Sequence, residues 1–386
     1  MLSVNQEGNA CNQDCHSCGY GNAKQQRDSK LKRISRSLIV RLVIGHANKC
    51  MTLEREYATP ARGFRLFAFK MMRLTFLLGL LLGLPFAAQQ SPQAASTKTG
   101  PTVQEKLGYP ATARLLIIHA DDFGMAHSVN RAISEALENG WVTSASILVP
   151  CPWLPEVARW AQSHPQADLG IHQALNSEWT DFRWGPVSSR DKVPSLLDGQ
   201  GYLPLLETQV ARQAKPAEVE GELRAQIDRA RSLGIPLTHL DTHMGALLGT
   251  PELIQMYREV AQDYRLPIPL KRAKNAEQLA LAPSESLVDE VLQITPGVPA
   301  EQWLKTYENM LQPLGPGVYE LIVHLAHDDD EMRGATSNHP DWGAAWRQHD
   351  LDMIKSAEFR QFLKDQGFVL VGWKDLAKAW RVAIPR

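Results

Sequence analysis

Short apolar segments alternate with helix-like segments from about residue 112 to the end of the chain. Most are apolar at successive positions, which is typical of parallel strands covered by helices on both faces. The predicted strands are 114–119, 144–149, 168–172, 237–241, 268–272, 319–324 and 368–372. This alternation predicts a single-domain α/β fold, a distorted parallel (β/α) barrel of about seven strands. A doubly wound open sheet is the alternative.

Helix start and stop signals punctuate the segments between these strands, with proline near several starts and glycine past several ends. The predicted helices are 128–138, 216–233, 251–264, 299–311 and 350–366, the last with a capping carboxylate at Asp350. Residues 174–215 break the alternation, and we expect them to form an insertion over the functional site. The folded domain is predicted to span 112–386.

Charge is unevenly distributed along the chain. Residues 1–73 carry 13 Lys/Arg against 5 Asp/Glu, whereas the remainder carries 28 against 37. An acidic body argues against a nucleic-acid partner. Residues 71–88 combine a basic start, a short apolar run and small residues at the end, which is the signal-peptide pattern. The run is shorter than the roughly 20 residues of a membrane span, so we expect an exported protein, periplasmic or extracellular, without a stable span after cleavage.

A signal peptide should begin a protein, so we expect residues 1–70 to be an over-extended or disordered segment. Residues 89–111, rich in small polar residues and proline, are the predicted linker. Four of the five cysteines precede residue 71, and the predicted domain keeps Cys151 alone, which excludes a disulfide framework. The spacing of Cys11, Cys15 and Cys18 matches radical iron–sulfur enzymes, but no apolar strand precedes it.

Acidic and imidazole side chains gather at the predicted carboxyl ends of four strands, where barrels carry their chemistry. Asp121 and Asp122 follow the first strand, and His172 ends the third. His243 follows the fourth, and His324 ends the sixth. Two adjacent carboxylates behind a buried strand are costly unless a cation or a reaction uses them. An ordinary turn with a helix cap is the alternative for the Asp pair.

The fourth predicted strand carries His239, Asp241 and His243 at alternate positions, which places them on one face. One histidine there can bind a metal while its neighbours orient it. Together the strand ends predict a site of one carboxylate and two imidazoles. Three protein ligands leave positions open for water and substrate, which is the catalytic arrangement. The expected cofactor is one divalent ion, Zn²⁺ by ligand softness or Mg²⁺.

Several motifs resemble the YdjC/ChbG-like carbohydrate deacetylases, which are related to polysaccharide deacetylases. They are Ile118-His-Ala-Asp-Asp-Phe-Gly124, Val129-Asn-Arg-Ala-Ile133, Gly140-Trp-Val-Thr-Ser144, Gly170-Ile-His172, Thr238-His-Leu-Asp-Thr-His243 and Gly372-Trp-Lys-Asp-Leu376. The resemblance extends over about residues 114–380. It implies a distorted (β/α) barrel that hydrolyses N-acetyl groups of sugars, so the expected partner is an N-acetylated oligosaccharide or glycan, with a homodimer as a candidate assembly.

The resemblance also implies roles for individual residues. Asp122, His172 and His243 match the metal ligands, and related enzymes are described with Mg²⁺. Asp121 matches the general base, and His324 stands where a late-strand general acid is expected. Arg272 matches an arginine that braces the base.

Three departures from the family pattern concern the substrate more than the metal. His119 stands where the family usually has Asn, Gln173-Ala174 follows the first metal histidine, and Leu325-Ala326-His327 follows His324.

Two other functions stay open from the sequence. A catalytically diverged, secreted sugar-binding barrel would not need a base and an acid beside a metal. A metal hydrolase acting on another bond, such as a phosphoester, would be expected to have basic clusters or a glycine-rich cradle. His327 with Asp328-Asp-Asp-Glu331 is either a second cation site or a solvated acidic loop. Trp179 and Trp184 are the best candidates for stacking on a sugar in the cleft.

Overall fold

The computed structural model describes residues 101–271 and 288–383. Seven strands form one parallel sheet in the order β4-β3-β2-β1-β6-β5, and β7 pairs with the first residues of β1. The strands are β1 (Arg114–Phe123), β2 (Ser144–Ile147), β3 (Leu169–Gln173), β4 (Leu237–Thr242), β5 (Glu290–Gln293), β6 (Gly317–Val323) and β7 (Phe368–Leu370). No pairing joins β4 to β5 within the described ranges, so the predicted barrel is confirmed in a distorted form.

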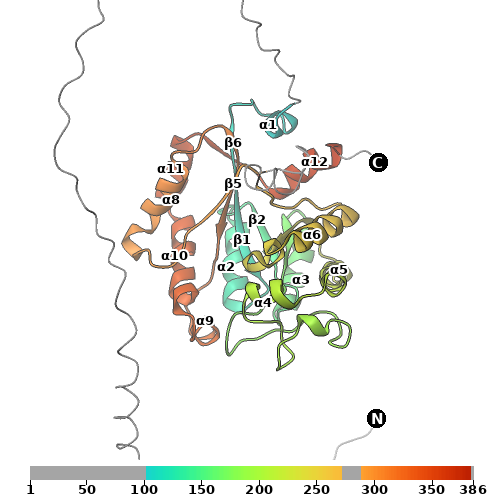
Figure 1. The fold of residues 1–386 in the computed structure, drawn as a ribbon. Coiled ribbons are helices and arrows are strands. Elements are labelled where there is room, and N and C mark those ends of the chain that lie inside the picture. The colour runs from blue at the N-terminus through green and yellow to red at the C-terminus, as the bar shows by residue number, and fades with distance from the viewer. Residues whose placement is uncertain (1–100, 272–287, 384–386) are drawn as a thin grey trace, which may run out of the picture. The chain divides into compact units, whose positions relative to one another are not determined.

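Helices cover the strands on both flanks, with α5 and α6 on one side and α8, α10 and α11 on the other (Figure 1). The α-helices are α1 (Val103–Lys106), α2 (His127–Glu138), α3 (Leu154–Ser163), α4 (Glu207–Gln213), α5 (Pro216–Ser232), α6 (Pro251–Tyr264), α8 (Trp303–Leu311), α9 (Asp330–Ala335), α10 (Ala344–Lys355), α11 (Ala357–Asp365) and α12 (Trp373–Ala383). Four short 3₁₀ turns are described as well: η1 (Pro194–Leu196), η2 (His243–Leu248), η3 (Ala300–Gln302) and η4 (Pro340–Trp342). Among the described residues, none of these helices has both the length and the apolar character that crossing a membrane requires.

Six of the predicted strands are confirmed, and the strand predicted at 268–272 is wrong. Pro267 and Pro269 lack the backbone N–H that a ladder needs, and in the described part of this segment only Lys271 forms an isolated bridge, to Val288. The missing strand is β5, which pairs with β6.

The helix predicted at 350–366 is also wrong as a single element. The chain leaves helical geometry at Ser356, whose side chain accepts a hydrogen bond from the N–H of Phe359 at 3.1 Å and starts α11. Asp350 therefore lies inside α10, fully buried, and caps nothing. The predicted helices at 128–138, 216–233 and 251–264 are confirmed, and 299–311 divides into η3 and α8.

The folded region includes the end of the predicted linker. Thr102 caps α1 in a reciprocal pair with Glu105, and Val103 is buried in a cluster with Leu115 and Ile117. The predicted segment 1–70, the signal peptide 71–88 and Arg272 lie outside the described residues.

Alternate residues of β1 pack to opposite sides. Leu116, Ile118 and Ala120 belong to the larger apolar cluster, whereas Leu115 and Ile117 belong to a smaller one. His119 and Asp121 are the next alternate residues of β1, on the same side of the strand as Leu115 and Ile117. The strand thus carries its polar side chains into the space where the candidate site forms.

The insertion 174–215 is fastened to α5 by buried polar side chains. Glu222 accepts hydrogen bonds from the backbone N–H groups of Val187 (2.8 Å) and Ser188 (2.9 Å). Gln226 donates to the carbonyl oxygen of Ala174 at 2.8 Å. These bonds fix the base of the insertion relative to β3 and α5.

Candidate active site

A local distortion at the end of β1 turns both adjacent carboxylates toward one point. The pairing of β1 with β2 shifts register between Ala120 and Phe123, and Asp122 adopts a left-handed backbone with φ 73°. In regular strand geometry neighbouring side chains point to opposite faces. Here His172 Nε2 lies 3.7 Å from Asp121 Oδ2 and 3.6 Å from Asp122 Oδ1. The Asp pair therefore belongs to a side-chain cluster and is more than a turn.

The structure brings together Asp122, His172 and His243, the three residues predicted as metal ligands. One candidate ligand atom from each lies within 4.8 Å of the others, and all three side chains are buried. Asp122 Oδ1 is 3.5 Å from His243 Nδ1 and has no hydrogen-bond partner. A buried carboxylate oxygen without a partner, facing two imidazole nitrogens, fits a divalent cation.

Each of these imidazoles is held from behind by a carboxylate. His172 Nδ1 lies 2.6 Å from Asp241 Oδ1, and His243 Nε2 lies 2.8 Å from Glu178 Oε2. This leaves His172 Nε2 and His243 Nδ1 directed at Asp122. Carboxylates behind metal-binding histidines fix the ring orientation and increase the basicity of the ligand nitrogen.

The sequence did not predict two residues of this arrangement, Glu178 and Arg347. Glu178 lies in the insertion, and Arg347 lies in the first turn of α10, so neither stands at a strand end. Arg347 Nη2 is buried 2.8 Å from Asp122 Oδ2. Burial opposes the charge on Asp122, but Arg347, His243 and His324 together outweigh burial and hold the pKa of that carboxyl well below its usual range. The other oxygen, Oδ1, stays free.

The electrostatics favour positive charge between the two histidines. Burial lowers the pKa of His243, but Glu178 and Asp122 more than compensate and raise that pKa to about 10. Burial is likewise outweighed at His172, where the charges of Asp241 and Asp121 raise the pKa. With a pKa of about 10, the His243 ring is positively charged at pH 7 without a cation, so a metal ion would compete with a proton for its nitrogen atom.

Asp121 and His324, the predicted base and acid, also lie next to each other. His324 Nε2 is 3.7 Å from Asp121 Oδ2. The His324 ring packs on Trp346, with centroids 5.4 Å apart, and its backbone N–H donates to Asp350 Oδ2 at 2.9 Å. Burial lowers the pKa of His324 to about 4, so the ring is neutral at pH 7.

Two further groups of side chains are close enough for a cation, but both depend on Asp241. They are His119 with His239 and Asp241, and Asp121 with His172 and Asp241. Both oxygens of Asp241 are already bonded, one to His172 and the other to His119. The group around Asp122 is therefore the best candidate metal site in the described part of the chain.

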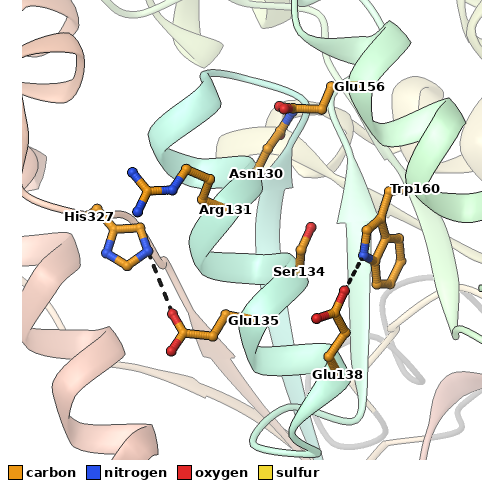
Figure 2. A pocket seen from close by; sticks show the side chains of 8 residues that line it. All are labelled: Asn130, Arg131, Ser134, Glu135, Glu138, Glu156, Trp160 and His327. Atoms are coloured by element: carbon orange, nitrogen blue, oxygen red, sulfur yellow. Dashed lines mark hydrogen bonds and ion pairs between the residues drawn. The ribbon is translucent and has the colours of Figure 1, made fainter.

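The acidic run after His327 does not converge on a cation site. Asp329 caps α9 and accepts a hydrogen bond from Ser128 Oγ at 2.6 Å. His327 lines a cavity of about 360 Å³ beside α2, where its Nε2 lies 3.6 Å from Glu135 (Figure 2). Glu138 in the same cavity already accepts from the indole of Trp160 (Figure 2).

The two tryptophans predicted to face the cleft are almost fully buried. Trp184 lies beside the candidate site, with its ring centroid 5.8 Å from that of His243, and its indole donates to the carbonyl oxygen of Asn176. Trp179 exposes 2% of its surface. Both rings are therefore packed inside the fold and offer no open face to a sugar.

The chain is similar to several known proteins. A family model described as YdjC-like protein matches residues 115–365. A carbohydrate deacetylase of Thermus thermophilus is 34% identical over 286 residues, which cover 71% of this chain and 98% of that protein. A carbohydrate deacetylase of Brevibacillus brevis is 29% identical, covering 68% and 99%. A solved Enterococcus faecalis structure, assigned to cellobiose-phosphate cleavage, shares 26% identity with a TM-score of 0.60 and covers 69% of this chain and 99% of that one.

Proposed function

This chain belongs to the YdjC-like protein family, and from that premise we propose that it is a metal-dependent carbohydrate deacetylase. Its reaction is the hydrolysis of N-acetyl groups on an amino-sugar-containing carbohydrate. Relatives named carbohydrate deacetylase, matched over nearly their whole length, support the reaction. The observation that carries the metal dependence is the unpartnered, buried Oδ1 of Asp122 between His172 and His243.

Asp122, His172 and His243 are the proposed ligands of one divalent ion. Two imidazoles and one carboxylate suit Zn²⁺, while Mg²⁺ is the other candidate. When bound, such an ion supplies a Lewis acid that polarises the acetyl carbonyl and lowers the pKa of water. Arg347 keeps Asp122 charged, and Asp241 and Glu178 keep the ligand nitrogens of the histidines aimed at it.

Asp121 is the proposed general base. Its carboxylate lies beside His172 Nε2, so it reaches the edge of the ligand cluster without being one of the three ligands. There it can accept the proton of the attacking water. General bases and acids in such positions typically contribute about 10²–10⁴-fold to the rate.

His324 is the proposed general acid for the departing amine. Because burial keeps its imidazole neutral at pH 7, it must gain a proton before it can give one. Asp121 Oδ2, 3.7 Å away, is positioned to supply the proton taken from water. Hydrogen bonds of this kind are often longer in ligand-free sites than in complexes with substrate.

The same geometry gives less support to the two competing functions. A sugar-binding barrel without catalysis has no use for a base and an acid 3.7 Å apart beside three potential ligands. A phosphoesterase would need cations for its substrate, but Arg347, the arginine at this site, is already engaged by Asp122.

The experiment is acetate release measured across chitooligosaccharides and peptidoglycan fragments, with phosphorylated sugars assayed in parallel for phosphate release. We expect acetate from at least one N-acetylated glycan and no phosphate. Phosphate release without acetate would overturn the proposal, and sugar binding with neither product would favour the non-catalytic barrel.

A further inference from the structure

The barrel interior beneath the candidate site is polar, although barrel interiors are usually filled by branched apolar side chains. Five polar side chains lie there, each exposing 6% of its surface or less: His119, Ser146, His239, Asp241 and Glu320. Burying polar groups costs free energy unless they bind one another. Their mutual contacts therefore indicate what the cluster does.

His119 is the side chain that joins this cluster to the active site. Its Nε2 lies 2.9 Å from Asp241 Oδ2 and 3.2 Å from Asp121 Oδ1. Ser146 Oγ is 3.1 Å from the same nitrogen and donates to Asp121 Oδ1 at 3.5 Å. One imidazole thus links the proposed base to the carboxylate that orients His172.

We propose that His119 is a positioning residue, which holds Asp121 and, through Asp241, the ligand His172 in one fixed arrangement. The inference rests on the roles proposed above for Asp121 and His172. His119 itself stands one layer deeper, behind the base, and acts through these two carboxylates.

Charge explains why an imidazole suits this position. Asp121 and Asp241 would repel each other if no donor stood between them. Burial opposes a charged ring at His119, but the hydrogen bonds that Asp121 and Asp241 accept from the ring, together with the charges of Asp241 and Glu320, outweigh burial and hold its pKa well above the ordinary value. One nitrogen donor between them therefore serves both carboxylates at once.

Glu320 lies next to the His119 ring, inside the barrel. Its Oε1 accepts a hydrogen bond from the indole of Trp373 at 2.7 Å and lies 4.0 Å from His119 Nδ1. His119 Nδ1 and Glu320 Oε2 are both buried without a hydrogen-bond partner. Glu320 is thus the nearest acidic group on the far side of the imidazole, opposite Asp121.

A second metal ion is the competing interpretation, because His119, His239 and Asp241 are close enough to share one. Both oxygens of Asp241 are already occupied by His172 and His119, which favours positioning. The metal content per chain separates the two interpretations.

The test compares His119→Gln with His119→Met. The amide nitrogen of Gln can reach the place of Nε2 and donate, whereas Met has similar length and no donor. For His119→Gln we expect kcat within about 10-fold of wild type, KM within about threefold and unchanged metal affinity. For His119→Met we expect kcat to fall about 100-fold and metal affinity, measured by calorimetry, about 10-fold, since His172 is less well oriented.

The matched control is His239→Gln, because the ring of His239 lies 5.0 Å from that of His119 but bonds to neither Asp121 nor Asp241. For this variant we expect kcat within about threefold of wild type. Equal kcat and metal affinity in the Gln and Met variants would overturn the proposal. So would two metal ions per wild-type chain with one lost in both variants.

Thermal unfolding of each variant shows whether it is folded. If His119→Met does not fold, Ser146→Ala replaces it. Its kcat is expected to fall about threefold or more at constant KM, and unchanged kcat would count against positioning. A wild-type protein that releases no acetate would refute the proposed function, whereas the difference in metal affinity would still decide the role of His119.

Discussion

His172 and His243 each direct one nitrogen toward Asp122 and the other toward a carboxylate. This pairing makes the site attractive to protons as well as to cations. The pKa of both rings is raised, and that of His243, about 10, means that its ring is positively charged at pH 7 when no metal is bound.

We therefore expect metal binding to release protons. Because the ligand nitrogens must be deprotonated, the apparent affinity should rise with pH between 6 and 9, by about tenfold per pH unit for each displaced proton. Calorimetry in two buffers of different ionisation enthalpy counts these protons. Glu178→Gln removes a main cause of the raised pKa of His243 and should flatten the dependence. An affinity independent of pH in the wild type would contradict this electrostatic account.

Glu320 provides a residue-scale test through stability. Burial raises the pKa of Glu320 to about 7, so the folded protein binds this proton more tightly than the unfolded chain, in which the pKa has its ordinary value of 4.5. The folded state therefore loses stability as pH rises from about 4.5 through 7. Glu320→Gln should be more stable than wild type at pH 8, by roughly 3 kcal/mol at most, and the advantage should vanish at pH 4.5. Urea unfolding at both pH values measures it; an equal difference at both would refute the assignment.

The residues that the sequence located are those at strand ends. Asp121, Asp122, His172, His243 and His324 were found because parallel strands bring their carboxyl ends to one edge. Glu178 and Arg347 carried no such signal. Their importance comes from contacts with His243 and Asp122 that only the folded chain creates.

At the scale of elements, the break between α10 and α11 shows how one polar side chain decides a boundary. The periodicity of 350–366 predicts one helix, yet Ser356 has an extended backbone and caps α11. Capping competes with helix continuation because the hydroxyl satisfies an N–H that the new helix would leave free.

Ser356→Ala should destabilise the protein by about 1 kcal/mol, because the N–H of Phe359 loses its acceptor. Ser356→Asp, which keeps an acceptor at the same place, is the matched control and should stay close to wild type. The two variants are compared by denaturant unfolding, and equal stability of Ala and Asp would show that the cap contributes nothing.

The strand prediction at 268–272 failed because apolar composition alone does not make a strand. The segment predicted at 268–272 starts apolar, but Pro269 inside it and Pro267 just before it cannot donate backbone hydrogen bonds to a neighbouring strand. The strand that forms instead, β5, is four residues long and only partly buried, so its sequence carries little alternation. Its place depends on pairing with β6, which is tertiary and invisible to a local pattern.

At the scale of the whole molecule, the site takes its side chains from elements all along the folded domain. Its side chains come from β1, β3, the start of η2, the end of β6, the insertion and α10. The sequence predicted the layered α/β class because alternation extends over the whole domain. It predicted a distorted barrel but not which strands would lie unpaired; in the described residues these are β4 and β5, and their place depends on pairing between distant segments.

Export stays a prediction at this scale. A chain that starts at Met71 should be exported and cleaved near Ala87 or Ala88, because residues 71–88 have the signal-peptide pattern. Fractionation and N-terminal sequencing measure this, with a chain lacking 71–88 as the retained control. Recovery of any peptide from residues 1–65 in the natural protein would show that the leader does not begin the chain.

The central claim is a division of labour between two adjacent carboxylates, with Asp122 on the metal and Asp121 on the water. The most direct measurement is metal content and acetate release on the same samples of wild type, Asp121→Asn and His243→Ala. The account predicts that Asp121→Asn keeps about one metal ion and loses at least 100-fold in kcat, whereas His243→Ala loses both metal and activity. Full metal occupancy in His243→Ala, or an active Asp121→Asn, would contradict it.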